Sequence, residues 1–180
     1  DGATPLFIAC QKDRMKVVSV LLARKDIQIN QAMNDGTTPL SMACTYGNLN
    51  IVNALLARKE IQINQPMNNG FTALHIACAY DHVNIVNALL KRDGIEINKP
   101  TNDGTTPLIV ASYVGNSSVV EALLSHAGIA TTGTVDGKTA YDCSNANMRI
   151  ATWSSYDGMI NENGRKNCQS LLKLFDQKKK

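Results

Sequence analysis

Three residues with metal-binding side chains, His75, Cys78 and His82, fall within one short stretch of the chain. Imidazole nitrogen and thiolate sulfur are common zinc ligands, so metal binding is the first chemistry to consider. The spacings of three and seven residues from His75 match no zinc-binding pattern. The structural alternative is that Cys78 belongs to a repeated buried position and that His82 simply follows a turn residue, Asp81. We favour this alternative and expect no metal site.

Motifs for other kinds of catalysis are missing from the sequence. It contains no Gly-rich phosphate loop, no Gly-x-Ser-x-Gly elbow, and no His, Cys and Asp set arranged for nucleophilic attack. The carboxylates that recur in Asp-Gly pairs, as at Asp35 and Asp103, are typical turn formers whose side chains bond nearby backbone amides. We therefore expect no catalytic residue and no cofactor within this chain.

The elements that must position these residues repeat along the chain. A six-residue phrase begins at Asp1, Asp35, Asn69 and Asp103, 34 residues apart each time, and a weaker copy begins at Asp136. Each unit then continues with Ala-Cys or Ala-Ser, a turn at Gly or Asp, a Val or Ile pair and a Leu-Leu pair. One supersecondary unit is therefore repeated about five times.

The second unit predicts two helices followed by a hairpin. Thr38 caps a helix that begins at Pro39, because proline at the first helical position loses only an amide that has no partner there. Gly47 suits the left-handed conformation that ends this helix, and Asp13 and Asp81 stand at the same place in other units. The second helix carries a buried stripe at Ile51, Val52, Leu55 and Leu56. An alternating segment and an Asn-Asn-Gly turn then form the hairpin.

The repeated Thr-Pro-Leu phrase, which reads Thr72-Ala-Leu-His75 in the third unit, resembles the signature of the ankyrin repeat family. The resemblance covers nearly the whole chain. It implies an all-α fold, an ankyrin-type solenoid of antiparallel helix pairs with projecting hairpin loops, and a His75 side chain that holds its turn by local hydrogen bonds. Because one unit cannot bury its own apolar face, stability must come from stacking. We expect residues 1–180 to form a single ankyrin repeat domain.

The two ends of the array are less regular than its middle. Asp1 begins directly at the turn phrase of a first unit that is as apolar as an interior one, so we expect a fragment of a longer protein. In the last unit the Leu-Leu pair arrives late, which places an insertion of about 15 residues within 145–163 and a capping helix at about 164–176. The insertion contains Trp153. It either shields the last repeat, which we favour, or contacts a partner.

Cysteine usage predicts a reducing compartment. Cys10, Cys44 and Cys78 occupy the same place in three successive units. Stacked helices lie about 8 to 10 Å apart, which exceeds the limit of about 7 Å between Cα atoms for a disulfide. We therefore interpret these cysteines as small buried hydrophobic residues. Cys143 and Cys168 fall in the irregular unit, and the sequence leaves open whether they approach each other.

The mild positive charge of the chain, +3 at pH 7, belongs to its C-terminal tail. Residues 162–180 carry six basic and two acidic side chains, whereas the rest of the chain carries 12 and 13. The repeats thus lack the excess of basic residues that binds DNA or a membrane surface, and no apolar run is long enough to span a membrane. We expect a cytoplasmic monomer that binds another protein or peptide and makes no membrane contact, and we rank nucleic acid below protein as a partner.

The resemblance implies that a partner binds the concave surface formed by hairpin tips and first helices. Tyr46 and Tyr80 fall at identical places in adjacent units, Tyr113 is one residue off the same line, and Phe71 lies in the unit of Tyr80. We expect these aromatics to be partly exposed and to anchor a partner. The alternative is that Tyr46 and Tyr80 pack on each other across the stack. The full set of candidate partner-binding residues is Lys12, Asn34, Asp35, Tyr46, Asn68, Asn69, Phe71, Tyr80, Asn102, Asp103, Tyr113 and Trp153.

Two functions follow from this interpretation. The first is a non-catalytic scaffold that binds a partner segment on its concave face. The second is a substrate-recruiting ankyrin domain of a larger enzyme whose catalytic domain lies outside this chain. If the source is a bacterial pathogen, we expect such a protein to be an effector that acts in host cytoplasm. Nucleic-acid binding is a weaker third hypothesis, because the repeats are nearly neutral.

Overall fold

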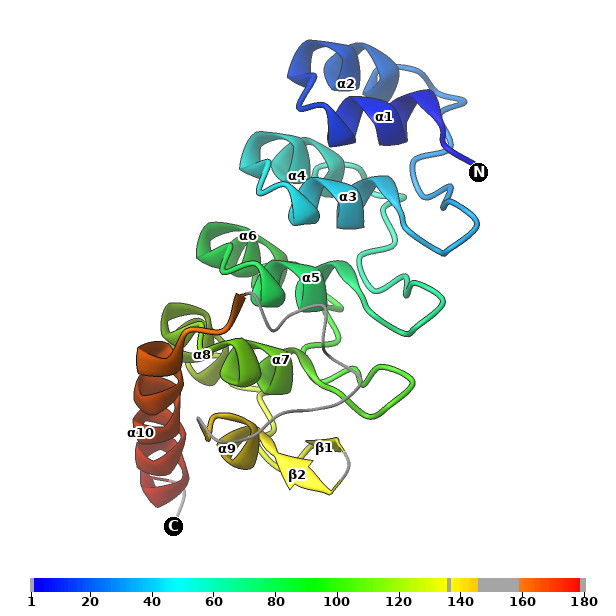
Figure 1. Ribbon diagram of the computed structural model, residues 1–180. Helices are drawn as coiled ribbons and strands as arrows, with labels where there is room; N and C mark the ends of the chain where they lie inside the picture. Colours follow the sequence, from blue (N-terminus) through cyan, green and yellow to red (C-terminus); the bar gives the residue numbers. More distant parts are fainter. Residues whose placement is uncertain (1, 136, 146–158, 179–180) are drawn as a thin grey trace.

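The computed structural model describes residues 2–135, 137–145 and 159–178. In these residues four helix pairs follow one another in a stack, and their connecting loops project to one side as hairpins (Figure 1). The solenoid expected from the sequence is confirmed. The helix pairs are α1 (Pro5–Gln11) with α2 (Met15–Leu22), α3 (Pro39–Thr45) with α4 (Leu49–Leu56), α5 (Ala73–Ala79) with α6 (Val83–Leu90), and α7 (Pro107–Val114) with α8 (Ser117–Leu124).

A shorter set of elements completes the stack. Strands β1 (Thr134–Val135) and β2 (Lys138–Thr139) form an antiparallel hairpin, which leads into α9 (Ala140–Cys143). The long helix α10 (Glu162–Lys178) packs against α7, α8 and α9 and covers the span for which we expect a capping helix (Figure 1). No helix in the described part of the chain is long and apolar enough to cross a membrane.

Each first helix has a threonine at its N-cap position. The Thr4 hydroxyl accepts a hydrogen bond from the Phe7 amide at 3.1 Å, and Thr106 accepts from the Ile109 amide at 3.4 Å. Thr38 accepts from the Ser41 amide at 3.1 Å, and the Ser41 hydroxyl accepts from the Thr38 amide. These bonds satisfy amides that have no partner inside the helix. The repeated threonine therefore sets where each unit starts.

The turn between the two helices of a unit needs a left-handed residue. Gly47 and Gly115 have φ of 71° and 92°, and Asp13 and Asp81 adopt φ of 51° and 59° at the same place. Aspartate tolerates this region better than most side chains, although at more cost than glycine. The turn predicted from the sequence is thus formed in four units with two residue types.

The core runs the length of the stack as one continuous layer. Leucines at one repeated place, Leu6, Leu40, Leu74 and Leu108, are all buried. The first helices α1, α3, α5, α7 and α9 pack in that order, and the second helices α2, α4, α6 and α8 do the same beside them. Cys10, Cys44 and Cys78 lie in this core as buried thiols, as we expected, and Cys143 and Cys168 are buried in the last unit. Burial raises the pKa of the Cys10 thiol to about 12.

Asparagine side chains join successive hairpins. The Asn68 amide group donates to the carbonyl of Asn34 at 2.9 Å, and that of Asn102 donates to the carbonyl of Asn68 at 2.8 Å. A Cβ atom on Gly70 would lie only 2.6 Å from the backbone nitrogen of Asn102, so glycine is required for this close approach of the two hairpins. The hairpins are therefore held at a fixed spacing by side-chain bonds that sequence periodicity did not reveal.

Candidate functional site

Two tyrosines stand exposed where first helices end. Tyr46 and Tyr80 directly follow α3 and α5, and they expose 54% and 39% of their surface. Both belong to the group of large apolar or aromatic side chains that remain exposed in the described part of the chain. The partial exposure expected of these two residues is confirmed.

The other two aromatics that we expected to be exposed are buried. Phe71 exposes only 7% of its surface and packs against the imidazole of His75, with 5.3 Å between ring centroids. Tyr113 is fully buried beneath the guanidinium of Arg165, which lies 4.5 Å from the ring centroid. One residue along a helix rotates a side chain by about 100°, so Tyr113 shares the buried side with Ala79 and not the exposed side with Tyr80. The expectation for Phe71 and Tyr113 was wrong.

The ring next to Tyr80 is that of a histidine. Tyr80 and His82 stack with their planes 11° apart and their centroids 6.2 Å apart. The His82 ring also covers Gly47 of the preceding unit, where an added Cβ atom would come within 2.7 Å of Cε1. Among the ring contacts of described residues, Tyr80 is thus paired with His82 and not with Tyr46. The exposed tyrosines, Tyr46 and Tyr80, therefore belong to the second and third units, and the His82 ring lies between Tyr80 and Gly47.

The hairpin tips are exposed, and their polar side chains are already used to shape the turns. Asp35 accepts a hydrogen bond from the Thr37 amide at 2.8 Å, and the bonds from Thr37 hold the pKa of the Asp35 carboxyl below its usual value. Asn69 and Asp103 accept in the same way from the amides two residues later. The six candidate tip residues form a rigid exposed edge, and they are Asn34, Asp35, Asn68, Asn69, Asn102 and Asp103.

Two further candidates lie elsewhere. Lys12 is exposed at the end of α1, at the same place in its unit as Tyr46 and Tyr80. Trp153 and most of the expected insertion lie outside the described residues.

The histidine and cysteine that suggested a metal have structural contacts. Both ring nitrogens of His75 are in hydrogen bonds: Nδ1 with Thr72 and Nε2 with the carbonyl of Thr105 in the next unit, at 3.1 Å. Burial lowers the pKa of His75 to about 4, so the ring is neutral at physiological pH. Burial also raises the pKa of the Cys78 thiol well above its usual value. No group of three or more His, Cys, Asp or Glu in the described residues is placed to hold a metal ion.

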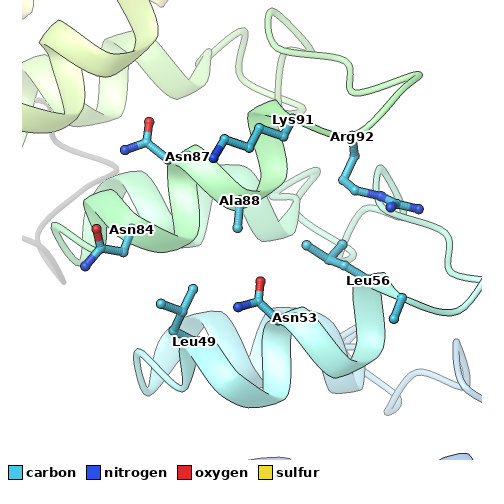
Figure 2. A pocket seen from close by; sticks show the side chains of 9 residues that line it. Leu49, Asn53, Leu56, Asn84, Asn87, Ala88, Lys91 and Arg92 are labelled. Atoms are coloured by element: carbon cyan, nitrogen blue, oxygen red, sulfur yellow. The ribbon is translucent and has the colours of Figure 1, made fainter.

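A groove that sequence reasoning missed lies between α4 and α6. It has a volume of about 570 Å³ (Figure 2). In Figure 2, Asn53 of α4 and Ala88 of α6 point toward one another across it, and Leu49 and Leu56 lie at its two ends. The remaining lining residues are Ala57, Asn84, Asn87, Lys91 and Arg92. We call this feature the α4/α6 groove. Its signal in the sequence is the repeated Asn-Ile-Val-Asn-Ala-Leu-Leu of 50–56 and 84–90.

Comparison with known proteins identifies the repeated unit. A family model described as ankyrin repeats, in three copies, matches residues 1–67 and 59–133. A search of curated proteins finds no match to the chain. The family match spans the regular units and ends before the irregular fifth one.

Proposed function

Since the chain belongs to the ankyrin repeat family, whose repeats are generally protein–protein interaction modules, we propose that it is a non-catalytic scaffold that binds a segment of a partner protein on its concave face. The observation that carries this proposal is the exposed pair Tyr46 and Tyr80 on a rigid stack. Tyrosine is enriched in the energetically dominant centres of protein interfaces.

The geometry supports a preformed binding surface. Tyr46 and Tyr80 follow buried helices, and the hairpin tips beside those helices are fixed by hydrogen bonds from one unit to the next, as between Asn68 and Asn34. A surface whose backbone is held in this way loses little conformational entropy on binding. The polar tips then orient the partner, and the tyrosines supply the buried contact area.

The experiment compares the native chain with a Tyr46→Ala/Tyr80→Ala variant. A partner is captured from cell extract, identified by mass spectrometry and purified, and its affinity for each form is then measured by calorimetry. We expect the variant to bind at least about tenfold more weakly, because loss of an interface anchor costs about 1 to 4 kcal/mol.

Tyr141→Ala is the matched control, because Tyr141 is a similarly exposed tyrosine on α9, away from the second and third units. It should leave the affinity unchanged. Circular dichroism must show that all forms keep their helices. Equal affinity of the native chain and a folded Tyr46→Ala/Tyr80→Ala variant would overturn the proposal.

A further inference from the structure

We propose that the α4/α6 groove is a second binding surface, which takes an acidic, leucine-bearing segment of another protein. This surface is lined by the second helices of two units, whereas Tyr46 and Tyr80 follow the first helices. The two surfaces can therefore be tested independently.

The groove offers both apolar and polar contacts. Leu49 and Ala88, both half-buried, provide apolar surface against which leucine side chains can pack, and the buried Leu56 lies at one end of the groove. Asn53, Asn84 and Asn87 are exposed beside them. Within the described residues, none of these three carboxamide groups forms a side-chain hydrogen bond, so their donors and acceptors face solvent. A carboxamide both donates and accepts, which suits carboxylates and peptide groups.

Residues 23–26, 57–60 and 91–94, which follow the second helices of the first three units, carry the same net charge of +1, but the third unit places both of its cations on the groove and has no acid at the fourth position. Arg24 of the first unit pairs with Asp26 at 2.8 Å, and Arg58 of the second pairs with Glu60 at 3.4 Å. The place of these acids is taken by Gly94 in the third unit, and Arg92 forms no ion pair among the described residues. Arg92 therefore has no internal carboxylate where its counterparts have one.

Other groups reinforce this difference. Arg58 is also held by the carbonyl of Leu22, the last residue of α2, to which its guanidinium donates. Lys91 adds a second cation to the groove, at the place where the first two units have Ala23 and Ala57. Asp93 is exposed next to Arg92 but does not line the groove. Complementary charge favours an acidic partner and disfavours a basic one.

The test uses a fluorescein-labelled peptide with leucines at helical spacing and glutamates between them, and a matched peptide with lysine in place of every glutamate. Fluorescence anisotropy should show saturable binding of the acidic peptide, weakened by added salt, and no binding of the lysine peptide. Lys91→Glu/Arg92→Glu should weaken the acidic peptide by about tenfold or more.

The control variant is Arg24→Glu/Lys25→Glu, which makes the same change in net charge just after α2 of the first unit, where Arg24 corresponds to Arg92 and Lys25 to Asp93. It should bind the acidic peptide as the native chain does. In NMR spectra the peptide should shift the carboxamide signals of Asn53, Asn84 and Asn87. The signal of Asn50 should stay in place, because Asn50 lies on α4 but does not line the groove.

Three results would each overturn the inference: no binding of the acidic peptide, equal binding of the lysine peptide, or an equal loss in the two charge variants. Thermal unfolding checks that every variant is folded. The Tyr46→Ala/Tyr80→Ala variant should bind the acidic peptide as the native chain does. A wrong proposal for the concave face and a wrong proposal for this groove can therefore be told apart.

Discussion

The two ends of the stack have apolar residues at the same places of the repeat but differ in what covers those residues. At the first unit, Val17 and Val20 of α2 expose 47% and 69% of their surface. The residues that correspond to Val17 in the next three units, Ile51, Ile85 and Val119, are buried. An apolar residue at this place is therefore buried only where a neighbouring unit lies against it.

The other end is covered by elements that do not follow the repeat. Helix α10 packs against α7 and α8, buries Leu172 and Cys168, and turns Lys173 and Asp176 to solvent. Its first turn comes very close to the C-terminal end of α7, because a Cβ atom on Gly164 would clash with the carbonyl oxygen of Gly115. A polar outer surface over an apolar inner one is what a terminal cap of a repeat array requires.

The largest loss of stability is expected when a charge is placed at the covered end of the stack. Val119→Lys places a charge in a fully buried position of α8 and should lower the free energy of unfolding by about 4 to 5 kcal/mol. Val17→Lys makes the same chemical change at an exposed position and should change it by less than about 0.5 kcal/mol. Urea titrations followed by circular dichroism give both values. Similar losses in the two variants would contradict the difference between the ends.

A smaller effect is expected where the cap is joined to the last regular unit. Arg165 is buried, its guanidinium lies over Tyr113, and its Nε donates to the Tyr113 carbonyl. Arg165→Ala removes these contacts and leaves a buried carbonyl short of a donor, so we expect a loss of about 3 kcal/mol.

Lys166→Ala, at an exposed neighbouring position of α10, is the control and should cost less than about 0.5 kcal/mol. Hydrogen exchange should show faster exchange of α10 amides in Arg165→Ala while α3 amides stay protected. Uniform loss of protection along the whole stack would indicate that the cap and the units unfold together and not separately.

The smallest effect concerns the joint between the second and third units. Asn48 donates to the Cys10 carbonyl at 3.0 Å, and Asn116 donates to the Cys78 carbonyl at 2.8 Å. At the same place His82 has a buried Nε2 without a hydrogen-bond partner in the described residues. His82→Asn should therefore stabilise the chain by about 1 kcal/mol, because its carboxamide can donate to the Cys44 carbonyl as Asn48 and Asn116 donate to the corresponding carbonyls.

The reverse change, Asn48→His, should destabilise the joint between the first two units by a similar amount. Urea midpoints measure both variants on the same scale. If His82→Asn lowers stability, the stacking of His82 on Tyr80 contributes more to the free energy of unfolding than the asparagine hydrogen bond does.

Local features of the fold were predictable, whereas surface features were only partly so. Thr38, Pro39 and Gly47 mark the limits of α3 because capping and left-handed turns depend on adjacent residues. The exposure of Tyr46 and Tyr80 also followed from their place beside a turn. The partner-binding roles of these tyrosines and of the tips remain predictions.

The sequence by itself determined the repeat, the helix pairs, the turns between them and the buried cysteines, because each depends on residue types at short and regular spacing. Only the tertiary structure decided that Tyr113 lies under Arg165, that Asn68 bonds to Asn34, and that Arg92 lines a groove between two units. The first two features depend on contacts between residues 34 and 52 positions apart, and the third depends on how the side chains of neighbouring units lie together. Periodicity describes what the units share, and the stacked structure shows where they differ.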